Sequence, residues 1–259
     1  METSLGDGGQ LHAGSGMEAL ALWTFGAESG AVVYSRDDLV NAYSQLRELM
    51  CYYRCAIREV ETKFRVLDEE FSLERDRNPI TRIQTRLKSP ESIYEKVLRV
   101  GVEPGIESLR QNMHDIGGVR IVCAFVEDVF LLADCLSRQD DVVILQRKDY
   151  IRNPKPNGYR SLHLIVEVPI FLSNCTKRMK VEVQLRTIAM EFWASLEHKL
   201  RYKKDIDSEL LKATEDALWQ CAELSADLDS KMQNVRHMID GFQLLSDMED
   251  QGNPESRWH

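Results

Sequence analysis

Two long segments with helical periodicity flank a central region of different character, and this division most limits the possible folds. Over residues 35–74, apolar residues recur at spacings of three and four, as they do along one face of a helix. A second segment, Ser208 to about Met248, carries apolar residues near heptad spacing. Residues 78–204 instead mix short alternating segments with short helical ones. The sequence therefore predicts an α/β (α+β) fold, in which a mixed β-sheet core is flanked by long N- and C-terminal helices.

Alternation of apolar and polar residues predicts four strands in the central region. The strands are expected at Gly118–Val126, Val142–Gln146, Ser161–Val168 and Met179–Leu185, with helices at Asp128–Arg138 and Thr187–Tyr202. The first two strands and the helix between them have a βαβ-like order, and the last two are expected to be joined by ten residues. Ser89 is expected to cap a short helix that has Pro90 at its first position.

The chain has the composition of a globular protein. It has 259 residues, of which 43% are hydrophobic and 29% charged, and this excludes fibrous and wholly disordered chains. It contains no apolar run near the roughly 20 residues that span a bilayer and no secretory signal, so we expect a soluble, cytoplasmic protein. The expected organisation is a disordered lead (1–34), a core domain with its N-terminal helix (35–204), a C-terminal helical segment (205–248) and a flexible tail (249–259).

The distribution of charge indicates an anionic ligand. The net charge of −9 argues against a general nucleic-acid binder, and it gives no support to RNA binding. Between Arg147 and Lys204, however, thirteen Lys and Arg residues stand against five Asp and Glu residues, a local excess of +8. A basic tract in an acidic protein favours a concentrated anionic ligand, although a basic exposed face is the alternative.

Four hydrophilic groups converge in the segment that leads into the Ser89 helix. Arg86 and Lys88 alternate on an extended segment, whereas Ser92 and Lys96 lie one turn apart on the helix. Cations and a hydroxyl near a helix N-terminus are suited to a polyphosphate. A solvated charged turn is the alternative for this segment taken alone.

Two carboxylates are candidates for a metal site. Asp115 directly precedes a strand that begins with two glycines and contains Arg120. Glu182 alternates with valines on another strand, so Glu182, Gln184 and Arg186 project from one face. An aspartate beside one strand and a glutamate on another can hold Mg²⁺ between them. A turn-forming aspartate and a solvent-facing polar strand are the alternatives.

The loop from Arg147 to His163 combines cations with aromatic rings. Such a Pro-x-Pro-Asn-Gly loop unites phosphate neutralisation with an aromatic platform for a base, whereas the alternative for Tyr159 is a half-buried residue at a strand entry. Its candidate residues are Lys148, Lys155, Asn157, Tyr159, Arg160 and His163.

At these residues the sequence resembles the synthetase domain of the RelA/SpoT family, and more closely its single-domain branch, the small alarmone synthetases. The similarity covers about Asn78 to Lys204 through the motifs R-x-K-S-P-E-S-x-x-x-K, H-D-I-G-G-V-R-I, K-D-Y-I-x-x-P-K-P-N-G-Y-R-S-L-H and V-E-V-Q-L-R-T. The resemblance implies a nucleotidyltransferase-like synthetase core. It also implies transfer of pyrophosphate from ATP to the 3′-hydroxyl of GDP or GTP, which gives the stringent-response alarmone (p)ppGpp and AMP.

The resemblance also implies roles for individual residues. Asp115 and Glu182 are the catalytic, Mg²⁺-associated carboxylates. Arg86 and Arg120 sandwich adenine, while Lys88, Ser92 and Lys96 face the ATP phosphates. The acceptor-nucleotide residues are Lys148, Lys155, Asn157, Tyr159 (which stacks on guanine), Arg160, His163, Gln184 and Arg186. Relatives in this branch form tetramers through their flanking helices, so a homotetramer is expected, although an intramolecular helical pair explains the 208–248 periodicity equally well.

Two other functions stay open at this point. One is a toxic relative that pyrophosphorylates tRNA 3′ ends or adenine nucleotides. The other is a catalytically inactive regulator that binds nucleotides or RNA. The first requires steep loss of activity with salt if its acceptor is tRNA.

Overall fold

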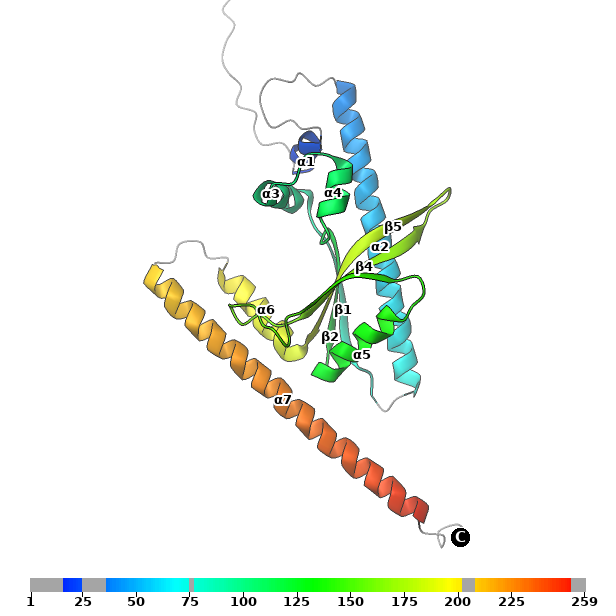
Figure 1. Cartoon of the computed structure of the whole chain (residues 1–259), viewed down its shortest axis with the longest axis vertical. Coiled ribbons are helices and arrows are strands. Elements are labelled where there is room, and N and C mark those ends of the chain that lie inside the picture. The colour runs from blue at the N-terminus through cyan, green and yellow to red at the C-terminus, as the bar shows by residue number, and fades with distance from the viewer. Residues whose placement is uncertain (1–15, 25–35, 75–76, 202–207, 253–259) are drawn as a thin grey trace, which may run out of the picture. The chain divides into compact units, whose positions relative to one another are not determined.

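The computed structural model describes residues 16–24, 36–74, 77–201 and 208–252. It confirms the mixed α/β fold with long flanking helices. The elements are α1 (Gly16–Thr24), α2 (Arg36–Glu74), β1 (Ile80–Leu87), α3 (Pro90–Val100), α4 (Ile106–Asn112), β2 (Gly117–Cys123), α5 (Val126–Ser137), β3 (Val143–Asp149), β4 (Leu162–Phe171), β5 (Thr176–Thr187), α6 (Ile188–Arg201) and α7 (Ser208–Gly252), as labelled in Figure 1.

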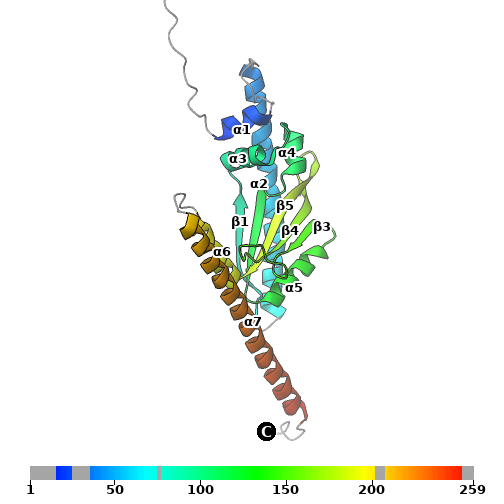
Figure 2. The same cartoon turned by 60° about the vertical axis from the view of Figure 1, so that its left-hand side comes forward.

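The strands form one five-stranded sheet in the order β1-β2-β5-β4-β3, which can be followed in Figure 2. The βαβ-like segment therefore does not form a unit of adjacent strands, because β5 and β4 lie between β2 and β3. The connection between β4 and β5 is also shorter than expected, since only residues 172–175 separate the two strands. Strand β4 continues to Phe171 and β5 begins at Thr176, and Arg178 on this added part of β5 pairs with Glu167 on β4 at 2.6 Å.

Contacts divide the chain into two compact units. Unit 1 comprises residues 1–60, 85–118 and 167–182, and unit 2 comprises residues 61–84, 119–166 and 183–259. In unit 1, helix α2 packs closely on the start of β2, because a Cβ at Gly117 would lie only 3.1 Å from the side chain of Ile57. In unit 2, α5 supplies buried leucines and β2, β4 and β5 supply buried Val, Ile and Leu residues.

Local capping sets the start of the helix that carries Ser92 and Lys96. The Ser89 hydroxyl accepts a hydrogen bond from the Ser92 backbone N–H at 3.3 Å, and Pro90 occupies the first turn of α3. The helix ends at Gly101, whose φ of 69° is a left-handed conformation that glycine adopts without strain. The predicted cap is therefore confirmed.

Helix α7 packs beside α6, as Figure 1 shows. In the part of α7 whose side chains are described, the buried residues are Ala222, Asp229 and Gln233. Ala222 packs on α6, Asp229 accepts a hydrogen bond from Thr187 at 2.6 Å, and Gln233 donates to Glu127 of α5 at 2.9 Å. Six apolar residues at near-heptad spacing instead have 42–75% of their surface exposed. They are Leu224, Leu228, Met232, Val235, Ile239 and Phe242. Packing on α6 therefore accounts for Leu218 of the periodic set but not for these six residues.

Four further features differ from the sequence prediction. Strand β1 is a fifth strand, where the sequence predicted only an extended segment around Arg86 and Lys88. Residues 16–24 form α1 rather than part of a disordered lead, because Leu20 and Trp23 are buried and the helix packs on α3. Helix α4 was not predicted, since its seven residues are too few for a clear period. Helix α7 extends into the expected flexible tail as far as Gly252. The rest of the lead (1–15, 25–34), the 204/205 boundary and residues 253–259 lie outside the described residues.

Among the described helices, none has the length and apolar character that a bilayer crossing requires.

Candidate active site

Within unit 1, Asp115 gathers two of the predicted cations. The ammonium groups of Lys88 and Lys96 both lie 2.6 Å from Asp115 Oδ2. Lys88 follows β1 directly, and its backbone N–H donates to the carbonyl of Ile116 at 2.8 Å, which holds the end of β1 beside the entry to β2. Lys96 reaches the same carboxylate from α3, one turn after Ser92. The sheet and a capped helix thus bring together residues up to 27 positions apart.

Burial and ion pairing together set the pKa values of Asp115 and Lys88. Burial favours the neutral form of Asp115, but hydrogen bonds and charge from Lys88 and Lys96 outweigh it, so the pKa of Asp115 lies below its ordinary value. Burial lowers the pKa of Lys88, against the opposing effect of Asp115. The second carboxylate oxygen, Asp115 Oδ1, is buried and has no hydrogen-bond partner in the described part of the chain. An unpaired anionic oxygen is suited to a cation.

Gly118 lies between the strands that carry Arg86 and Glu182. A Cβ at Gly118 would stand 3.7 Å from the carbonyl oxygen of Glu182 and 3.8 Å from that of Arg86. These three residues are therefore neighbours across β1, β2 and β5, in unit 1 with Asp115. The backbone of β2 at Gly118 therefore lies between the backbones of the two strands that carry Arg86 and Glu182.

Within unit 2, a glutamate that the sequence did not single out joins two of the predicted arginines. Glu191 Oε1 lies 3.0 Å from Arg120 Nη1, and Glu191 Oε2 lies 2.8 Å from Arg186 Nη1. Both arginines also donate to the side-chain oxygen of Gln184, Arg186 at 3.0 Å and Arg120 at 3.4 Å. Glu191 and Arg186 are nearly fully buried, so the network holds the two guanidinium groups in defined positions.

Tyr159 extends this network to the basic loop. Its hydroxyl accepts a hydrogen bond from Arg186 Nη2 and lies 2.8 Å from His163 Nε2. The ammonium of Lys155 stands 4.7 Å from the centre of the Tyr159 ring and 4.8 Å from that of Tyr150. The loop therefore presents aromatic rings and cations together, as the sequence predicts.

The backbone of the loop is fixed by its own turn. Gly158 has a φ of 86°, which favours glycine, and its N–H donates to the Lys155 carbonyl at 2.8 Å. Asn157 donates to Glu197 at 3.2 Å, and Arg160 pairs with Glu223 at 3.0 Å. Lys148, near the end of β3, is exposed.

The comparisons with known proteins agree on one family. The model of the region found in RelA / SpoT proteins matches residues 85–207. GTP pyrophosphokinase YwaC of Bacillus subtilis is 41% identical over 204 residues, which cover 79% of this chain and 96% of that protein. The chain belongs to the small alarmone synthetases of the RelA/SpoT family.

Solved structures of small alarmone synthetases share this fold. The crystal structure of small alarmone synthetase 2 from Bacillus subtilis is 40% identical, with a TM-score of 0.66 over 75% of this chain and 99% of that chain. Small alarmone synthetase 1 from the same organism, bound to its product pppGpp, is 32% identical, with a TM-score of 0.68 over 75% of this chain and 98% of that chain. The resemblance inferred from the motifs is thus confirmed.

For this small alarmone synthetase, the structure brings together several of the candidate residues that the sequence predicts, and it adds supporting residues that the sequence did not indicate. Lys88, Lys96 and Asp115 come together in unit 1, and Arg120, Tyr159, His163, Gln184 and Arg186 do so in unit 2. Glu191, Glu223 and Tyr150 were missed. Glu191 and Glu223 lie on helices outside the recognised motifs, so only the contacts reveal them. Tyr150 lies inside the K-D-Y-I motif, where its position beside a loop of cations is a usable signal.

Proposed function

We propose that this protein is an ATP-dependent GTP/GDP diphosphokinase that transfers pyrophosphate from ATP to the 3′-hydroxyl of GDP or GTP and releases (p)ppGpp and AMP. The observation that carries the proposal is the Asp115 cluster. A carboxylate with one oxygen paired to two lysines and the other unpaired, beside a capped helix N-terminus, is suited to a metal-bound polyphosphate. The curated relative and both solved structures described above carry the names of this same activity.

The resemblance to the family assigns the donor ATP to Arg86, Lys88, Ser92, Lys96 and Arg120. Lys88, Lys96 and Ser92 bind the phosphates, and Arg86 and Arg120 bind the adenine as a pair of planar cations. Lys88 and Lys96 exchange part of their pairing with Asp115 for phosphate oxygens when ATP binds. The existing ion pairs keep both ammonium groups in place before the substrate arrives.

Asp115 and Glu182 fit a magnesium site. Within the described residues, no three His, Cys, Asp or Glu side chains gather as a metal site. Two carboxylates suffice for Mg²⁺, because it usually completes its shell with water and substrate phosphates. The unpaired Asp115 Oδ1 is the oxygen that fits this ligand role. Mg²⁺ held by these residues would supply charge neutralisation for the transferred phosphates. Glu182 would also accept the proton of the 3′-hydroxyl and so help to activate it.

The acceptor nucleotide is assigned to unit 2. The ring of Tyr159 is the platform for guanine, and Gln184, Arg186 and His163 support it through the hydroxyl network. The phosphate-binding cations are Lys148, Lys155 and Arg160, with Asn157 shaping the loop through its hydrogen bond to the Tyr159 N–H at 3.2 Å. Together they neutralise the anionic acceptor.

The decisive assay follows label from ATP. Purified protein is incubated with Mg²⁺, ATP labelled in the β,γ positions, and GDP, GTP or total tRNA in parallel, and the products are separated by thin-layer chromatography. We expect label on GDP or GTP, none with Glu182→Gln, and wild-type transfer with Glu167→Gln, a strand residue that pairs with Arg178. Label on tRNA alone would place the protein with tRNA-modifying relatives, and no transfer to any acceptor would refute the proposed activity.

The exposed stripe on α7 supports the proposal of a homo-oligomer, with a tetramer as the expected state. Its apolar residues recur every three or four positions along the helix and face away from the residues that dock on α6. Light scattering of wild-type protein and of Leu228→Glu tests this, since the charge should dissociate an assembly held by the stripe. We propose a cytoplasmic location, where ATP and guanine nucleotides are available.

A further inference from the structure

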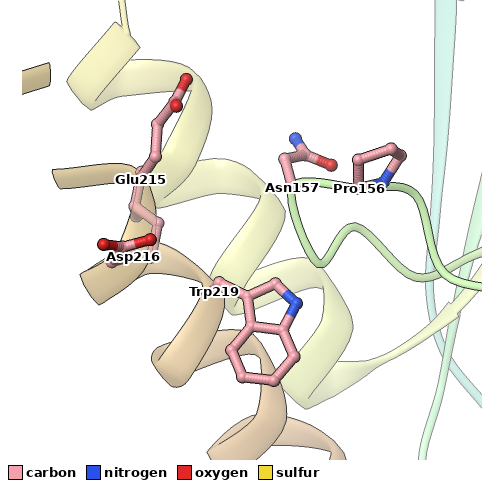
Figure 3. A pocket seen from close by; sticks show the side chains of 6 residues that line it. Pro156, Asn157, Glu215, Asp216 and Trp219 are labelled. Atoms are coloured by element: carbon pink, nitrogen blue, oxygen red, sulfur yellow. The ribbon is translucent and has the colours of Figure 1, made fainter. Parts of the chain in front are cut away.

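The loop that carries Tyr159 rests on helix α7, which belongs to no motif of the site. At Gly158 the approach is so close that a Cβ would lie 2.5 Å from the Cβ of Ala222. Figure 3 shows Pro156 and Asn157 of the loop facing Glu215, Asp216 and Trp219 of α7 across a small hollow. This approach therefore leaves no room for a side chain at position 158 opposite Ala222.

An ion pair fastens the same loop to the same helix. Arg160 follows Tyr159 and pairs with Glu223 at 3.0 Å, next to Ala222 on α7. The Arg160 side chain has only 16% of its surface exposed, and its Nη1 has no hydrogen-bond partner among the described residues. Glu223 is therefore the carboxylate that directly compensates this largely buried charge.

An apolar cluster completes the contact. Trp193 and Ala194 of α6 pack with Ala222 of α7, and Tyr159 packs against this cluster. The indole N–H of Trp193 donates to the backbone carbonyl of Leu218 at 2.8 Å, which ties α7 to α6 at the level of the loop. The position of Tyr159 thus depends on both helices as well as on its own turn.

We propose that α7 positions the acceptor loop, with Ala222 and Glu223 as positioning residues for binding of the guanine nucleotide. This inference rests on the proposed function, because it assigns α7 a role in acceptor binding. Helix α7 holds the Tyr159 ring ready before the nucleotide binds, and this preorganisation lowers the entropic cost of binding. Among the described contacts, Lys88, Lys96 and Asp115 make none with α7, and Arg120 reaches Tyr159 only through Gln184, Glu191 and Arg186. The KM for ATP should therefore change much less than the KM for the acceptor.

The first test changes the contact without touching the site. Ala222→Leu should displace Gly158 and raise the KM for GDP or GTP by about 10-fold or more, with the KM for ATP and the kcat at saturating acceptor changed by less than about twofold. Ala217→Leu makes the same substitution at an exposed position of α7, and both constants should match the wild type. Ala222→Ser, which is nearly as small, should restore tight acceptor binding.

A second variant covers the case in which Ala222→Leu does not fold. Glu223→Gln removes the charge that pairs with Arg160 and should raise the acceptor KM about 3- to 10-fold. Asp227→Asn, at an exposed residue that pairs only with Lys231 among the described contacts, is its control. In both loop variants, hydrogen exchange of a peptide over residues 152–161 should be faster than in the wild type.

The outcomes separate this inference from the proposed function. If the variants raise the KM of both nucleotides equally, or leave the acceptor KM and the loop exchange unchanged, α7 does not position the loop. If wild-type protein transfers pyrophosphate to no guanine nucleotide, the proposed function fails. In that case the hydrogen exchange measurement still decides whether α7 orders the loop, and unchanged exchange refutes that as well.

Discussion

Replacing Glu191 by alanine tests whether one carboxylate supports both Arg120 and Arg186, the two arginines that we assign to nucleotide binding. Glu191 Oε1 pairs with Arg120 at 3.0 Å, and Glu191 Oε2 pairs with Arg186 at 2.8 Å. The side chains of Glu191 and Arg186 have 9% and 6% of their surface exposed, whereas Arg120 is 31% exposed. The substitution therefore leaves the Arg186 guanidinium buried without its counter-charge, and it leaves the Arg120 guanidinium unpaired and only partly hydrated.

The magnitude follows from this burial. Removing one partner of a fully buried pair costs about 3–5 kcal/mol, because the other charge stays behind. Arg186 keeps Gln184 and Tyr159 as acceptors, so we expect the lower end, about 3 kcal/mol. At about 2–4 °C per kcal/mol for a chain of this size, the Tm should fall by about 6–12 °C. Glu191→Gln keeps the shape and one acceptor oxygen and should cost about half as much.

Thermal and urea unfolding of the purified variants measure the loss, and steady-state kinetics should show a higher KM for ATP and for the acceptor together. Glu167→Ala is the matched control, because it removes an ion pair whose partner Arg178 is 44% exposed. That control should cost less than about 1 kcal/mol. An unchanged Tm in Glu191→Ala, or a rise in only one KM, would refute the shared support.

Three further predictions concern single side chains. Asp115→Asn should lower kcat in the transfer assay by about 100-fold or more, because it removes the charge expected to hold the metal. Asp140→Asn changes an exposed residue and should keep wild-type activity in the same assay. Full activity in Asp115→Asn would contradict the metal assignment. Tyr159→Phe keeps the ring but loses the hydroxyl contacts to Arg186 and His163, so initial-rate measurements should show a rise of about 3- to 10-fold in the acceptor KM with the ATP KM unchanged. Burial raises the pKa of Asp229, against its hydrogen bond from Thr187, so the ionised carboxylate destabilises the fold at neutral pH and this cost disappears as the pH falls through the raised value. Asp229→Asn should therefore melt above the wild type at pH 7.5, with the difference shrinking towards pH 4 in a series of melting curves, and a difference that grows in acid would be inconsistent with this sign.

Local sequence patterns predicted most of the helices and four of the five strands, and they selected most of the candidate site. The Ser89-Pro90 start of α3 was predictable because a cap depends on residues three positions apart. The spacing of apolar residues likewise marked α2, α6 and α7, since helical periodicity repeats within one or two turns. The motifs around Asp115, Tyr159 and Glu182 identified the family, which the comparisons confirmed.

Only the tertiary structure decided how distant segments meet. The sheet order β1-β2-β5-β4-β3 separates β2 from β3, the two strands whose sequence order is βαβ-like. Strand pairing depends on contacts between residues far apart in the chain, so the sequence order alone does not predict it. Glu191 lies 71 residues from Arg120, and Glu223 lies 63 residues from Arg160, so no local pattern marks either glutamate as part of the site. The same applies to α7, whose heptad-like spacing is visible in the sequence, whereas its docking through Ala222 and Asp229 is not. Which face of an amphipathic helix becomes buried is determined by the surface that packs against it, and that surface exists only once the sheet and α6 have formed.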